Sequence, residues 1–140
     1  MDYLIIEGGL NDCYGSYPLE VLSEGYDSTY DRTTFYGALE DMFSDIVKKT
    51  PSTKTGFIIM PMADTPNWGT YVEVIKAACD KWGIMYLDLD GLMRARLVDM
   101  GLNSDSIYWS IYPDGNTNPH PSAYGYEMMN SKIFSWMNTL

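Results

Sequence analysis

The chain has 140 residues, of which 46% are hydrophobic, and this supports a single domain with one core, residues 1–140. Its formal net charge is -10, so nucleic acid and anionic membrane surfaces are disfavoured as partners. No apolar stretch approaches the ~20 residues of a membrane-spanning helix, and the chain does not begin like a secretory signal. The composition is typical of an acidic, soluble domain and leaves the cellular compartment open.

Three short apolar runs predict strands: Tyr3–Ile6, Gly56–Met60 and Ile84–Leu87. Each run is continuous and bounded by turn residues, a pattern that fits strands buried on both faces of a parallel sheet. Because the first run starts almost at Met1, we expect the chain to be cut at its N-terminus.

Helical patterns separate and follow these runs. The first ends at Lys48-Lys49, just before Pro51, the second ends at Gly83, and Ser122 is a candidate cap for the third. The apolar positions at helical spacing are Phe35, Leu39, Met42, Phe43, Ile46 and Val47; then Tyr71, Val74, Ile75, Ala78 and Trp82; then Met129, Ile133, Phe134 and Met137.

The predicted order is therefore β-α-β-α-β-loop-α, which favours parallel strands joined by right-handed crossovers. Ligands of such sheets bind beyond the carboxyl ends of the strands. The segments of interest are consequently 7–16, 61–70 and the residues from Asp88 onward.

The first of these segments contains Gly8-Gly9-Leu10-Asn11-Asp12 directly after a predicted strand. Glycine lets the backbone turn sharply and approach a ligand. The Asn11 amide could donate a hydrogen bond to an oxygen that becomes negative during acyl transfer. The alternative is an Asx turn, in which Asn11 or Asp12 bonds its own backbone.

His120 is the only histidine, and it lies between Pro119 and Pro121 on a predicted loop before the last helix. A nearby carboxylate, such as Asp114, could orient its imidazole and stabilise the charged form. The alternative is a structural or surface histidine.

Together the two stretches resemble the SGNH hydrolase superfamily, the GDSL-like esterases and lipases. Gly9-Leu10-Asn11-Asp12 matches the Gly-x-Asn-Asp segment of that family, and His120-Pro121, followed by Ser-Ala-Tyr-Gly-Tyr, matches its histidine segment. The resemblance covers nearly the whole chain. It implies a three-layer α/β/α sandwich with a parallel sheet, flavodoxin-like, that lacks the first two strands.

The resemblance also implies roles for site residues. Asn11, in the segment that begins at Gly9, would donate to the oxyanion, and His120 would be the general base, oriented by Asp114. The family has its aspartate three residues before the histidine, where this chain has Thr117, and Asp114 lies six residues before. Either the loop is longer, or a backbone carbonyl or an amide orients His120.

The nucleophile segment of the family, Gly-Asp-Ser, does not occur in this sequence. Its expected position falls before Met1, and a serine esterase without its serine has no covalent step. Ser16 and Cys13 follow the asparagine segment and are the weaker candidates for a substitute nucleophile. The two cysteines, Cys13 and Cys79, form no metal-ligand pattern. Two free thiols are therefore an open alternative.

Asp88-Leu-Asp90-Gly91 resembles the phosphoryl-transfer motif of haloacid-dehalogenase-like phosphatases, in which Mg²⁺ assists. That motif normally opens its domain, whereas only about fifty residues follow it here. Structural roles for both aspartates are the main alternative, although a cation bound by Asp88 and Asp90 is conceivable because the two share a face.

The sequence thus predicts part of a serine esterase that hydrolyses an acetyl or short acyl ester of a small molecule or a carbohydrate, without metal or cofactor. The alternative is a non-catalytic binding or structural module on the same scaffold. Because an apolar strand with an open edge tends to pair, we expect Tyr3–Ile6 to mediate a homodimer or to bind a separate N-terminal segment.

Overall fold

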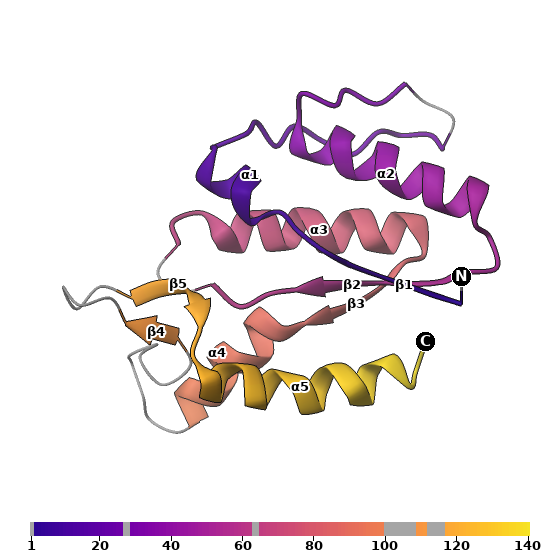
Figure 1. Cartoon of the computed structure of the whole chain (residues 1–140). Helices are drawn as coiled ribbons and strands as arrows, with labels where there is room; N and C mark the ends of the chain where they lie inside the picture. Colours follow the sequence, from indigo (N-terminus) through magenta and orange to yellow (C-terminus); the bar gives the residue numbers. More distant parts are fainter. Residues whose placement is uncertain (1, 27–28, 63–64, 100–108, 112–116) are drawn as a thin grey trace. The chain divides into compact units, whose positions relative to one another are not determined.

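A computed structural model describes residues 2–26, 29–62, 65–99, 109–111 and 117–140 (Figure 1). The elements, in chain order, are β1 (Tyr3–Glu7), α1 (Leu10–Tyr14), α2 (Phe35–Lys49), β2 (Lys54–Ile59), α3 (Trp68–Trp82), β3 (Met85–Asp88), α4 (Leu89–Asp99), β4 (Trp109–Ile111), β5 (Thr117–Pro121) and α5 (Ala123–Met137). No helix among these residues is long and apolar enough to cross a membrane.

The main sheet has the strand order β1-β2-β3, and its strands alternate with helices along the chain. β1 and β2 are parallel, with Tyr3 opposite Lys54 and Glu7 opposite Ile58. This confirms the predicted α/β class with a parallel sheet. Within the described residues, β1 pairs along one edge only.

The chain forms two compact units, each built from two separate segments. The first comprises residues 1–58 and 67–86, and the second comprises 59–66 and 87–140. The chain therefore passes between the units three times, at about residues 58, 66 and 86.

The core of the first unit forms where α2 and α3 pack together and α2 covers β2. Phe43 of α2 meets Phe57 of β2 edge to face, with ring centroids 6.1 Å apart, and both rings are almost fully buried. The apolar positions predicted for α3 are all buried. That helix ends as expected at Gly83, which has a φ of 65°.

Side-chain caps are present at the starts of α2 and α5. The Thr34 hydroxyl accepts a hydrogen bond from the Gly37 backbone N–H, 3.1 Å away, at the start of α2. The Ser122 hydroxyl accepts one from the Gly125 N–H, also 3.1 Å away, and so confirms the predicted cap of α5. Each bond satisfies a backbone donor that the helix itself leaves unpaired.

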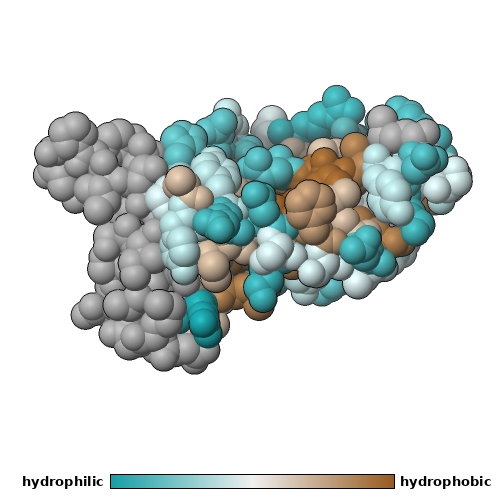
Figure 2. All heavy atoms as spheres, turned by 60° about the horizontal axis from the view of Figure 1, so that its bottom comes forward, coloured by the Kyte–Doolittle hydropathy of each residue, from teal (hydrophilic) through white to brown (hydrophobic). Residues whose placement is uncertain are grey.

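Several expectations about burial and local structure are wrong. Of the three strands in the main sheet, β2 is buried along most of its length, whereas Tyr3 of β1 is 44% exposed and Met85 of β3 is 45% exposed. The segment expected to be a loop after Asp88 forms α4, and part of it forms the antiparallel β4–β5 hairpin. Phe134 of α5 is 69% exposed rather than part of the core. Figure 2 shows brown, apolar surface among hydrophilic residues on one face.

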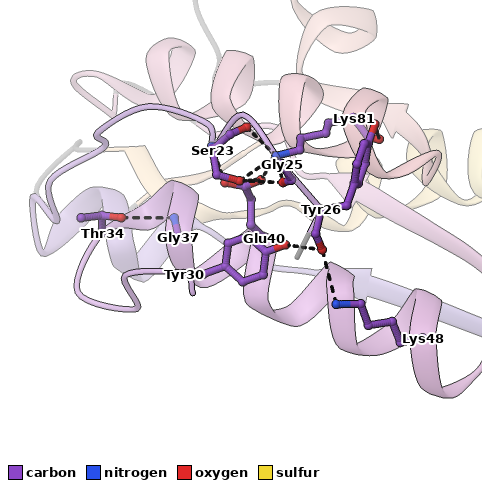
Figure 3. Close-up of polar contacts among 9 residues, drawn as sticks. All are labelled: Ser23, Gly25, Tyr26, Tyr30, Thr34, Gly37, Glu40, Lys48 and Lys81. Carbon is purple, nitrogen blue, oxygen red and sulfur yellow. Dashed lines mark hydrogen bonds and ion pairs between the residues drawn. The ribbon is translucent and has the colours of Figure 1, made fainter. Parts of the chain in front are cut away.

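One polar cluster, which we call the Ser23 clamp, consists of Ser23, Glu40 and Lys81 (Figure 3). The Glu40 carboxylate accepts hydrogen bonds from the Ser23 N–H at 2.8 Å and from the Ser23 hydroxyl at 3.0 Å. The Lys81 ammonium pairs with Glu40 and donates to the carbonyl oxygens of Ser23 at 2.6 Å and Gly25 at 3.0 Å. The clamp therefore fastens the segment between α1 and α2 to both α2 and α3.

A second cluster, the Met62 clamp, consists of Met62, Asp90 and Arg94. The Asp90 carboxylate accepts a hydrogen bond from the Met62 N–H at 3.1 Å and pairs with the Arg94 guanidinium at 3.0 Å. Arg94 in turn donates to the Met62 carbonyl oxygen. The clamp fastens the segment that follows β2 to α4.

Candidate active site

The Gly9 backbone sets the geometry of the asparagine segment. β1 ends at Glu7, and Gly9 follows with a φ of 95°, a conformation that favours glycine. A Cβ atom at this position would lie 3.1 Å from Phe35 and 3.2 Å from Ile75, so a side chain would also crowd the core. The turn at Gly9 leads directly into the short helix α1.

Asn11 lies on α1 and is exposed. Among the described residues its side chain makes no hydrogen bond, so the Asx turn that the sequence left open does not form. α1 itself is held in place by the Tyr71 hydroxyl, which donates to the carbonyl oxygens of Tyr17 at 2.6 Å and Asp12 at 3.3 Å. The Asn11 amide is thus presented to solvent from a fixed backbone.

A cavity of about 220 Å³ lies beside this turn, within the first unit. It is lined by residues 6–9 and Asp12, and by apolar residues of α2 such as Phe35, Leu39 and Met42. The cavity thus combines an apolar wall with the glycine turn.

His120 lies in the second unit, near the end of β5. The sequence predicted a loop here, but β5 pairs with β4, and Pro121 ends the strand immediately before the Ser122 cap of α5. The imidazole is exposed. Its backbone is therefore anchored on both sides, by a hairpin and by a capped helix. Asp114, its expected partner, lies outside the described residues.

Gly9 and Asn11 belong to the first unit and His120 to the second. Gly9 and Asn11 are brought together by the β1–α1 turn. Whether His120 approaches Asn11 stays a prediction.

The two substitute nucleophiles line a cavity of about 280 Å³ with Tyr17 and Tyr71. Cys13 is 7% exposed, and its burial raises the pKa of the thiol, which opposes formation of the reactive thiolate. Ser16 is exposed and has a φ of 52°, a conformation uncommon for residues other than glycine. The surroundings of Cys13 argue against it as a nucleophile.

The aspartates of the phosphatase-like motif have structural partners. The Asp88 carboxylate accepts a hydrogen bond from the Gly91 N–H at 2.7 Å, and Asp90 belongs to the Met62 clamp. Across the described residues, no group of three or more His, Cys, Asp or Glu side chains could hold a metal ion. The structural alternative for this motif is therefore favoured.

Solved structures with the same fold include three that match over 99% of this chain. A protein from Bacteroides ovatus that bears the name GDSL-like lipase superimposes with a TM-score of 0.68 at 19% identity, and one of the same name from Bacteroides uniformis with 0.67 at 15%. A Lactobacillus plantarum protein gives a TM-score of 0.71 at 20% identity. The match covers 55%, 53% and 67% of those chains, respectively.

The chain therefore has the α/β fold of the GDSL-like proteins, as the resemblance predicted, and spans little more than half the length of the two named lipases. No protein-family model matches the sequence, and no curated protein does either.

Proposed function

We propose that this chain supplies the oxyanion-hole and histidine segments of a serine ester hydrolase whose nucleophile lies outside the 140 residues. The observation that carries the proposal is the Gly9–Asn11 turn at the carboxyl end of a parallel strand, in a GDSL-like fold. Asn11 is exposed on this turn, and Gly9 and Asp12 on either side of it line a small cavity.

In this proposal the Asn11 amide donates to the oxygen of the tetrahedral intermediate. His120 takes the proton of the attacking serine and later returns it to the leaving alcohol. Asp114 orients the imidazole. The chemistry needs no cofactor, and the cavity beside Gly9 favours an acetyl or another short acyl group, carried by a small molecule or a carbohydrate.

The open edge of β1 is where the missing segment would bind. β1 is the outermost strand of the sheet, and its residues Leu4–Ile6 are only half-buried. A strand added there would extend the parallel sheet and cover apolar side chains. The alternative occupant is β1 of a second copy.

The test is labelling with a fluorophosphonate probe, mapped by peptide mass spectrometry. The 140-residue chain and the chain extended by the sequence that precedes it in its gene are compared. We expect one serine in the extension to be labelled. Asn11→Ala should then lower kcat for p-nitrophenyl acetate by about 10²–10³, and His120→Ala by at least about a thousandfold.

Asn138→Ala serves as the matched control, because Asn138 is an exposed asparagine at the end of α5. It should leave both labelling and kcat unchanged. Labelling of Ser16 in the 140-residue chain, dependent on His120, would instead put the nucleophile inside this sequence.

A non-catalytic binding module is the second candidate. The absence of Gly-Asp-Ser from the sequence and the burial of Cys13 favour it for the chain taken alone. An extended protein that is neither labelled nor active would establish this candidate over the first.

A further inference from the structure

The cations of this acidic chain are almost all paired. Seven of its nine Lys and Arg side chains contact a carboxylate, a backbone carbonyl or an aromatic ring. They are Arg32, Lys48, Lys49, Lys54, Lys76, Lys81 and Arg94. The other two, Arg96 and Lys132, have no such partner among the described residues.

These two unpaired cations line the same cavity. It has a volume of about 360 Å³ and lies in the second unit, where α4 contributes Leu89, Leu92, Met93 and Arg96, and α5 contributes Met128 and Lys132. The α4 residues follow the i, i+3, i+4, i+7 spacing of one helix face. Its volume is at the lower end of the ~300–1,000 Å³ typical of small-molecule sites.

The apolar part of the lining is incompletely covered. Leu89 and Met93 are buried, but Leu92 is 48% exposed. Methionine side chains adapt readily to apolar ligands of differing shape. The cavity thus offers an aliphatic wall and two cations that have no carboxylate partner in the described part of the chain, although Asp and Glu outnumber Lys and Arg by 19 to 9.

We propose that the α4–α5 cavity binds a single small anionic amphiphile, an aliphatic chain that ends in a carboxylate. The chain packs against Leu92, Met93 and Met128, and the carboxylate pairs with Arg96 and Lys132. This site is separate from the Gly9–Asn11 turn and does not depend on the proposed esterase function.

The test is titration of the chain with octanoate by isothermal titration calorimetry. We expect saturable binding at one site. Octan-1-ol, which has the same tail without the charge, should bind about tenfold more weakly, and octyltrimethylammonium should not bind. Added salt should weaken octanoate binding and leave that of octan-1-ol unchanged.

Three variants locate the site. The double variant Arg96→Gln/Lys132→Gln should weaken octanoate binding by about tenfold or more, because both exposed cations are lost. Leu92→Glu, which adds a negative charge to the lining at an exposed position, should abolish it. The matched control Arg32→Gln/Lys49→Gln removes the same charge from the first unit and should change binding by less than twofold.

Equal binding of octanoate and octan-1-ol, or equal effects of the two double variants, would overturn the proposal. Charge-dependent co-sedimentation with phosphatidylglycerol vesicles, without binding of free octanoate, would overturn it as well, because the cavity would then serve a membrane surface instead of a single molecule. Circular dichroism of each variant confirms that loss of binding is not loss of fold.

Discussion

The two clamps use the same device in different surroundings. In each, a carboxylate accepts a hydrogen bond from the N–H of one residue, and the cation paired with that carboxylate donates to the carbonyl oxygen of the same residue. Ser23 is held in this way in the first unit and Met62 in the second. Both polar groups of one peptide residue are thus satisfied by a single ion pair.

The clamps differ in burial and in what they connect. The Glu40 and Lys81 side chains are 1% and 11% exposed and come from two helices, so the Ser23 clamp joins three parts of the chain. Asp90 and Arg94 lie four residues apart on α4, and Arg94 is 42% exposed, so the Met62 clamp joins only two. We therefore expect burial and connectivity, more than the bonding pattern, to set the contribution of each ion pair to stability.

Lys81→Met should have the largest effect. It leaves the Glu40 carboxylate buried without its cation, and we expect a loss of about 3–5 kcal/mol in the free energy of unfolding, measured by urea denaturation. Lys76→Met is the matched control, since Lys76 lies on the same helix and pairs with the exposed Glu73; it should cost about 1 kcal/mol or less. If both variants lose similar amounts of unfolding free energy, burial does not determine how much an ion pair contributes.

The pH dependence of stability should come partly from Glu40. Burial alone would raise the pKa of this carboxyl, but the hydrogen bonds from Lys81 and Ser23 and the charge of Lys81 outweigh burial and lower it. The unfolded chain therefore binds the Glu40 proton more tightly than the folded chain does. The contribution of Glu40 to the free energy of unfolding is present above the unfolded pKa, about 4.3, and is lost as the pH falls through the folded pKa. Glu40→Gln should make the free energy of unfolding fall less steeply as the pH is lowered. An unchanged fall would mean that other carboxyls cause the loss of stability in acid.

Asp90→Asn should cost less, about 1–2 kcal/mol, because solvent already screens the half-exposed Arg94. Exchange of the Met62 amide hydrogen, measured by NMR, should become faster as its acceptor weakens. Asp45→Asn is the control, because Asp45 also pairs with a cation four residues away, Lys49, but on an exposed surface. If Asp90→Asn lowers the free energy of unfolding as much as Lys81→Met does, the two clamps contribute equally to stability.

Arg94→Lys should have the smallest effect, about 1 kcal/mol or less. Lysine keeps the charge beside Asp90 but lacks the planar fork that also reaches the Met62 carbonyl. Thermal unfolding should change little, and exchange of the Met62 amide should stay slow. Rapid exchange in this variant would mean that the arginine, and not the aspartate, fixes the segment.

The elements that the sequence predicted well are those with strong local signals. The apolar spacing of α2 and α3, the terminal Gly83 and the Ser122 cap all act within one or two turns of helix, so the pattern alone was sufficient. The resemblance added the fold, and it implied that Asn11 donates to the oxyanion, a role that stays a prediction.

The missed elements depend on distant partners. α4 contains Gly91 and several charged residues, and its start is held by Asp88 and by the Met62 clamp. β5 contains Pro119 and Pro121, which disfavour a strand, and it forms because β4 pairs with it. The relation of His120 to Asn11, which belong to different units, stays a prediction, because no local pattern specifies such a tertiary arrangement.

The Ser23 clamp also has a consequence for the time course of folding. It joins Ser23 to Lys81 across 58 residues of sequence, and Glu40 to Lys81 across 41. Contacts between such distant residues are costly to close before the helices that carry them have formed. We therefore expect the clamp to close late, so that it acts mainly on the lifetime of the folded chain and hardly on the speed of its refolding.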